Sequence, residues 1–175
     1  MTAVTSLAIT VLGRDRPGII AQTTSILAEL GLNLEDSSMT LLRGHFAMTL
    51  ICAGSVSSGE IALALEPMAQ DGSLTVTVRE VPDEPEHGPV AASYVLTVHG
   101  GDRPGIVSAI AAEVASVGGN ITDLTTRLAG DLYLLVAEVD LPTGVDATAL
   151  EASLTGVAAG LGVDVGLRPV ESDEL

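Results

Sequence analysis

The sequence is poor in the residues that bind nucleic acids or membranes. It has seven Lys and Arg against 23 Asp and Glu, a formal net charge of −16, and the basic residues are scattered without aromatic residues between them. A chain of this charge repels phosphate backbones and anionic lipids, so direct binding to nucleic acids or membranes is not expected. The sequence also lacks the basic N-terminal region of a signal peptide and any apolar run near the roughly 18 residues that span a bilayer. These absences predict a soluble cytoplasmic protein.

Cysteine and clusters of metal ligands are equally scarce. Cys52 is the single cysteine, which excludes an intrachain disulfide, and it lies in the apolar run 47–53. We therefore expect a buried side chain rather than a nucleophile. The His, Cys, Asp and Glu residues show no metal-site spacing, so neither a metal nor another cofactor is expected. The remaining composition, 47% hydrophobic residues, is that of a chain that folds.

The most informative feature that is present is an internal repeat. Residues 13–19 read Gly-Arg-Asp-Arg-Pro-Gly-Ile, and residues 100–106 read Gly-Gly-Asp-Arg-Pro-Gly-Ile, at an offset of 87 positions. The same offset superposes Gly31 on Gly118, Asn33 on Asn120, Asp36 on Asp123, Leu41 on Leu128 and Phe46 on Tyr133. A long period that occurs twice indicates two tandem copies of a small domain rather than a solenoid.

The hydrophobic periodicity predicts the order βαββαβ in each copy. The predicted strands are 6–12, 33–42, 45–53 and 74–81 in the first copy and 93–99, 120–128, 132–140 and 163–170 in the second. The predicted helices are 17–30, 58–70, 104–117 and 145–160. We predict a first domain at 1–81, an acidic, proline-rich linker at 82–91, a second domain at 92–170 and an acidic tail at 171–175.

This order is typical of an α+β fold with two ferredoxin-like units, in which an antiparallel four-stranded sheet carries both helices on one face. The strands at 46–52 and 132–139 are nearly continuous in apolar residues, a pattern typical of burial on both faces. We therefore expect another copy of the chain to cover the helix-free faces, which makes the protein a homo-oligomer, most simply a dimer.

The sequence of strand, Gly-x-Asp-Arg-Pro-Gly-Ile loop, helix, Gly-x-Asn and strand, given twice, resembles tandem ACT-domain proteins over nearly the whole chain. Within that family the chain is most similar to the glycine cleavage system transcriptional repressor group. The resemblance implies a non-catalytic regulator that binds a small ligand, usually an amino acid, at interfaces between ACT units. Binding would be passed on to a partner enzyme or regulator, and any effect on transcription would run through that partner.

The repeated loop is the candidate ligand site. A strand that feeds a helix N-terminus presents unpaired backbone N–H groups to an anion, and Gly13 and Gly18 allow close approach. The candidate ligand-binding residues are Gly13, Asp15, Arg16, Pro17, Gly18, Ile19 and Asn33 in the first copy and Gly100, Asp102, Arg103, Pro104, Gly105, Ile106 and Asn120 in the second.

Each candidate side chain also has a purely structural interpretation. The two Asp could cap the helix or accept a ligand ammonium group. The two Arg could bind a ligand carboxylate or lie on the surface, and the two Asn could contact the ligand or make a turn. The copies also differ, because Gly101 replaces Arg14 and His99 replaces Leu12.

Two other classes of function compete with a sensor. An enzyme would need Asp15 or Asp102 as a base, but no nucleophile, phosphate loop or metal motif accompanies either residue. A ligand-independent interaction module would keep the repeat only as a pairing surface.

Overall fold

The computed structural model describes residues 5–82 and 90–170, which form two compact units with one half of the chain in each. The predicted tail and most of the predicted linker lie outside the described residues. The first unit consists of β1 (Thr5–Arg14), α1 (Ile19–Glu29), β2 (Asn33–Leu42), β3 (His45–Gly54), α2 (Ser58–Ala69) and β4 (Leu74–Val81). The second consists of β5 (Val90–Gly101), α3 (Ile106–Ser116), β6 (Asn120–Ala129), β7 (Leu132–Pro142), α4 (Ala147–Leu161) and β8 (Val163–Pro169).

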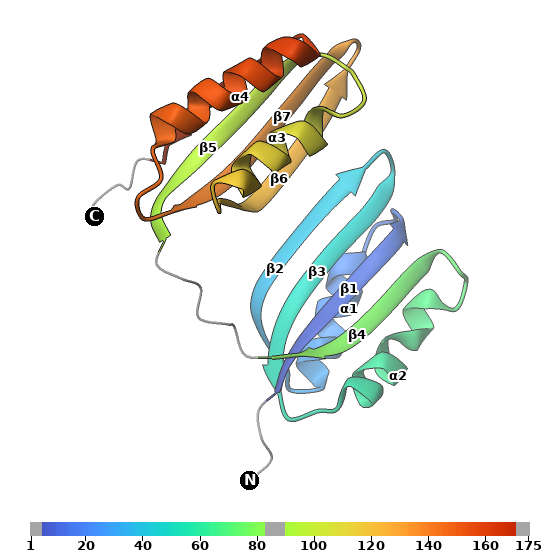
Figure 1. Cartoon of the computed structure of the whole chain (residues 1–175). Helices are drawn as coiled ribbons and strands as arrows, with labels where there is room; N and C mark the ends of the chain where they lie inside the picture. Colours follow the sequence, from blue (N-terminus) through green and yellow to red (C-terminus); the bar gives the residue numbers. More distant parts are fainter. Residues whose placement is uncertain (1–4, 83–89, 171–175) are drawn as a thin grey trace. The chain divides into compact units, whose positions relative to one another are not determined.

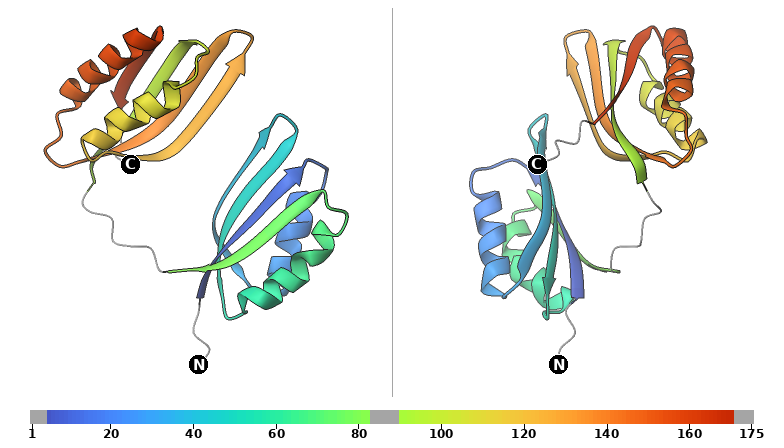
Figure 2. Two further views of the ribbon diagram at one scale, coloured as in Figure 1. Left: turned by 45° about the vertical axis from the view of Figure 1, so that its right-hand side comes forward. Right: turned by 90° about the vertical axis from the view of Figure 1, so that its left-hand side faces the viewer.

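Each unit is an antiparallel four-stranded sheet with its two helices on one face (Figures 1 and 2). The strand order is β2-β3-β1-β4 in the first sheet and β6-β7-β5-β8 in the second. The first and third strands of each unit therefore lie at the centre of the sheet. The predicted α+β fold, with two ferredoxin-like βαββαβ units, is confirmed.

The core of each unit lies between the sheet and its helices. In the first unit, β1 contributes Leu7, Ile9 and Val11, all fully buried, and these residues are separated by side chains that point to the opposite face. The helices add Ile19 and Ile61, at 1% and 0% exposure. Strand side chains alternate between the two faces of the sheet, whereas helices bury one stripe of side chains. The core is therefore built from apolar residues that recur with the strand period in the strands and with the helix period in the helices.

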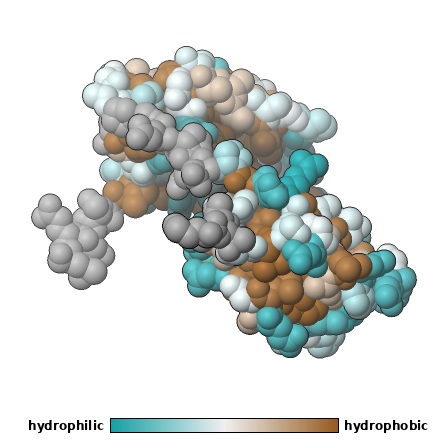
Figure 3. Space-filling model, turned by 90° about the horizontal axis from the view of Figure 1, so that it is seen from below, coloured by the Kyte–Doolittle hydropathy of each residue, from teal (hydrophilic) through white to brown (hydrophobic). Residues whose placement is uncertain are grey.

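The helix-free faces carry exposed apolar residues in the single chain, and their predicted burial by a second copy stays a prediction. In β7, the helix-facing Leu135, Ala137 and Val139 are buried, but Leu134 and Val136 on the opposite face are 40% and 37% exposed. Only alternate residues of the continuous apolar run in β7 therefore pack into the core. Figure 3 shows that apolar residues reach the surface in several places of the described structure.

Several boundaries shift from the predicted ones. Helix α1 begins at Ile19 rather than at residue 17, because Gly18 takes a left-handed conformation and precedes the first helical turn. Strand β5 begins at Val90, so the end of the range assigned to the linker joins the second sheet, where Val90 pairs with Pro142. Within the described ranges, no helix is long and apolar enough to cross a membrane.

Candidate functional site

Three turns meet at the end of β1 in the first unit. The loop between β1 and α1 lies between the β2–β3 turn and the turn that precedes β4. The Asp15 N–H donates to the Gly44 carbonyl at 3.2 Å, and the Arg14 N–H donates to the Ser73 carbonyl at 2.9 Å. These backbone bonds hold the loop at both sides, so its conformation is fixed by the sheet.

A glycine at the end of the first strand is required by close backbone packing in both units. A Cβ built on Gly13 would lie 2.0 Å from the Ser73 carbonyl oxygen. One built on Gly100 would lie 2.9 Å from the Cα of Val163. Neither space can hold a methyl group without movement of the backbone. The first glycine of the repeated motif therefore brings the loop against the turn before the last strand.

The predicted capping of the helix by Asp15 and Asp102 is wrong. The N-caps are Gly18 and Gly105, with φ of 91° and 96°, and no side chain of the described residues caps either helix. The two aspartates lie three residues earlier, on the far side of the proline. The first N–H groups of α1 and α3 are thus left for water or a ligand, and the helix dipole favours an anion there.

Arg16 turns back toward the turn at 71–73. Its Nε atom is buried and has no hydrogen-bond partner among the described residues. The guanidinium lies near Asp71, whose pKa is lowered first by the polar groups of the neighbouring Ser73, of which the N–H donates to Asp71 Oδ1 at 2.9 Å, and then by the charge of Arg16. The Ser73 hydroxyl itself is buried in an orientation that makes no hydrogen bond within the described structure. A buried donor without a partner costs about 1–3 kcal/mol, which an incoming acceptor would recover.

The loop of the second unit has different neighbours. The Arg103 guanidinium lies against Gly162, with Cζ 3.5 Å from the place of a Cβ. Burial, with a smaller contribution from the Asp102 charge, raises the pKa of Tyr133, which stands where the first unit has Phe46. His99, in place of Leu12, lies 3.7 Å from the Asp164 carboxylate, and both side chains are exposed. The two loops share a backbone but not a chemical environment.

The structure does not bring all predicted residues together. Asn33 pairs with Ala53, which pairs with Ser6 at the far end of β1. Seven residues separate Ser6 from Gly13, so at about 3.3 Å per residue Asn33 lies roughly 23 Å from the loop. Asn120 lies at the same offset from Gly100 in the second unit. A ligand held by one loop cannot reach the Asn of the same unit.

The remaining predicted residues lie in or beside the loops. Pro17 and Gly18 are exposed, whereas the side chains of Ile19 and Ile106 are buried in the cores, so only their backbone N–H groups could face a ligand. Sequence reasoning missed Gly44, Asp71 and Ser73, because these residues join the site only through strand pairing and carry no motif. Within the described parts of the chain, no three His, Cys, Asp or Glu residues are placed to hold a metal ion.

Comparison with known proteins gives the same division into two units. The family model described as "ACT domain" matches residues 5–79 and 93–168. A UPF0237 protein of Methanopyrus kandleri is 38% identical over 78 residues, which are 43% of this chain and 87% of that protein. The glycine cleavage system transcriptional repressor of Escherichia coli is 24% identical over 172 residues, 94% of this chain and 90% of that protein.

Solved structures agree on the fold. A protein of Galdieria sulphuraria, 30% identical, superposes with a TM-score of 0.81 over 97% of this chain and 100% of that one. A second structure, 19% identical, has a TM-score of 0.72 and covers 97% of this chain and 99% of its own. The arrangement of two βαββαβ units in one chain is thus shared by other proteins.

Proposed function

Because this chain belongs to the ACT domain family, with one unit at residues 5–79 and another at 93–168, we propose that it is a regulatory protein that binds an amino acid at its strand–helix loops and thereby controls a partner protein. The Escherichia coli relative is a transcriptional repressor of the glycine cleavage system, so the proposed partner is a regulator of amino-acid metabolism. With a net charge of −16, the chain would act on transcription through that protein rather than by binding DNA.

The observation that carries the proposal is a combination of two features in the described first unit. The Nε of Arg16 is buried without a hydrogen-bond partner, and the N-terminus of α1, in the same loop region, has no side-chain cap. A carboxylate placed there would accept hydrogen bonds from the guanidinium and from backbone N–H groups. Such charge-assisted bonds are stronger than neutral ones. Asp15 in the same loop would accept the ammonium group of the ligand. This combination favours an amino acid over a simple carboxylate.

Asn33 and Asn120 enter the proposal through an ACT unit of a second copy of the chain. Each lies too far from the loop of its own unit to share a ligand with it. An ACT unit of a second copy, placed with its Asn against the loop, would supply the amide and close the site. Ligand binding would then shift the equilibrium between two arrangements of the assembly, with a coupling of typically about 1–3 kcal/mol.

Isothermal titration calorimetry against single amino acids, glycine included, tests this function, since the chain has no Trp for fluorescence. A sensor should bind one of them with micromolar to millimolar affinity, about −8 to −4 kcal/mol. Arg16→Gln should weaken binding by about tenfold through loss of a charge-assisted bond, whereas Arg79→Gln, on the exposed face of β4, should not. Asp15→Asn should weaken the binding of an amino acid, but not the binding of the corresponding carboxylate that lacks the amino group.

Absence of heat with every amino acid would contradict the sensor. The exposed apolar residues of the sheets favour a second function in that case, a ligand-independent module that pairs with other proteins. A stable partner complex that ignores added amino acids would then be expected.

A further inference from the structure

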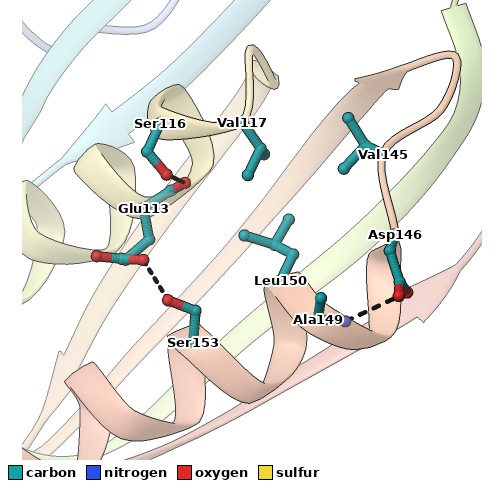
Figure 4. A pocket seen from close by; sticks show the side chains of 8 residues that line it. All are labelled: Glu113, Ser116, Val117, Val145, Asp146, Ala149, Leu150 and Ser153. Atoms are coloured by element: carbon teal, nitrogen blue, oxygen red, sulfur yellow. Dashed lines mark hydrogen bonds between the residues drawn. The ribbon is translucent and has the colours of Figure 1, made fainter.

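The second unit has a pocket of 370 Å³ between the end of α3 and the start of α4 (Figure 4). Val117, Val145 and Leu150 form its apolar floor, and Glu113 and Asp146 lie at its two ends. The pocket lies near the C-terminal end of α3, whereas the candidate loop precedes the N-terminus of that helix. At 1.5 Å per residue, the seven residues from Ile106 to Glu113 separate the two places by roughly 10 Å along the helix.

The internal repeat shows how the pocket arises. In the first unit, the positions of Glu113 and Val117 are taken by Ile26 and Leu30, which pack against the core. The second unit replaces one of these large apolar side chains by a carboxylate and the other by a shorter one. The two units therefore differ in size and charge at this point of the helix pair, and the second unit has a pocket there.

Both carboxylates at the pocket are held in place and keep acceptor capacity. Glu113 Oε2 accepts from the Ser153 hydroxyl, and Asp146 Oδ1 accepts from the N–H of Thr148 at 2.9 Å. The second oxygen of each carboxylate has no hydrogen bond within the described residues, and neither Lys nor Arg lines the pocket. The site thus combines an apolar floor with unneutralised negative charge.

We propose that this pocket binds a small primary alkylammonium ion, with its alkyl chain on Val117, Val145 and Leu150 and its ammonium group on the free oxygen of Glu113. A protonated amine supplies three donors and a charge opposite to that of the site, while its chain covers the apolar floor. A carboxylate-bearing ligand would be repelled by both ends. The pocket therefore selects a different class of compound from the loops and does not depend on the function proposed for them.

Methyl-detected NMR of the full chain titrated with n-butylammonium chloride tests the proposal. The methyl signals of Val117, Val145 and Leu150 should shift and saturate, and sodium butyrate should leave them unchanged. Glu113→Gln keeps the volume but removes the charge, so it should weaken binding by about tenfold. Glu66→Gln, which removes the same charge from an exposed position on α2 in the first unit, should bind like the wild type.

A double substitution, E113I with V117L, should abolish the shifts because it removes the carboxylate and introduces the larger apolar side chains found at these positions in the first unit. The proposal is overturned if no methyl signal responds to butylammonium, if butyrate produces equal shifts, or if Glu113→Gln binds as tightly as the wild type. The single variant is nearly isosteric, so the test does not depend on the folding of the double one.

Discussion

At the scale of single residues, the repeated Gly-x-Asp-Arg-Pro-Gly-Ile motif combines one packing requirement with several recognition groups. Its first glycine packs against the backbone of the turn that precedes the last strand. Its second glycine has a left-handed conformation and is the N-cap of the helix. The aspartate and arginine between them are free of these constraints. The motif is therefore better explained by a loop held close to the sheet than by a capped helix.

Replacement of Gly13 tests the packing requirement. Gly13→Ala should destabilise the first unit by about 1–3 kcal/mol, because the new methyl group would overlap the Ser73 carbonyl, which is backbone and cannot turn away. Urea unfolding followed through the ring protons of Phe46, the single Phe of the chain, reports on this unit alone. Gly59→Ala in α2 is the matched control. Its Cβ meets nothing within 4 Å, so the helix should gain about 0.5–1 kcal/mol. Equal stability of wild type and Gly13→Ala would contradict the argument.

The residues of the candidate site were partly predictable from the sequence. The repeat identified the loop, since identical residues at a fixed offset need no structure to be seen. Of the two roles considered for Asp15, capping is wrong, because it depends on which residue precedes the first helical turn, and that residue is Gly18, three positions further along the chain. The contribution of Ser73 could not be predicted, because it rests on the register of β4 against β1.

At the scale of elements, the pattern of apolar residues was a good guide to type and a poorer one to ends. β2 and β4 begin and end where the periodicity predicted. β5 runs from Val90 to Gly101, beyond the predicted 93–99, because it pairs with β7 as far as Pro142 and Leu132. Pairing of this kind extends a strand through residues such as Gly100 and Gly101 that have no strand preference of their own.

Helix α2 begins with a capping box that the pattern of apolar residues did not predict. The Ser57 hydroxyl accepts from the Glu60 N–H at 3.3 Å, and the Glu60 carboxylate accepts from the Ser57 N–H at 3.2 Å, which forms a capping box. The Ser57 hydroxyl also donates to that carboxylate at 2.7 Å. These bonds, the side-chain one foremost, lower the pKa of Glu60 below its ordinary value of 4.5.

The capping box predicts how the first unit responds to acid. A carboxylate whose pKa is lowered by folding stabilises the folded state above its unfolded pKa, and this stability is lost as the pH falls through the lowered folded value. When the pH is lowered below about 4.5, the urea concentration at the unfolding midpoint of the first unit should therefore decrease, and it should decrease less in Glu60→Gln. Glu66→Gln on the same helix should follow the wild type. Ser57→Ala should cost about 1 kcal/mol at neutral pH. A Glu60→Gln profile parallel to the wild type would rule out the linkage.

At the scale of the whole molecule, the exposed apolar residues on the helix-free face of each sheet bear on whether the chain forms an oligomer. The helix-free side of β7 exposes Leu132, Leu134 and Val136, at 51%, 40% and 37%. In the first unit, Leu12 of β1 and Leu42 of β2 lie on the helix-free face and are 50% and 49% exposed. Apolar residues grouped on one face mark a contact surface more often than isolated ones do. The helix-free faces keep the property that led us to expect a second copy.

Sedimentation velocity of the pure protein tests this expectation. If a second copy covers the helix-free face of the second unit, the wild type should sediment at micromolar concentration with twice the chain mass of 17.7 kDa. Leu134→Asp should sediment as a monomer, because it would bury a charge without a partner in the interface. Leu63→Asp is the control: Leu63 is 69% exposed on α2, away from the sheet face, so the dimer should persist. A monomeric wild type would remove the second copy, and with it the proposed source of the Asn amide at a loop site.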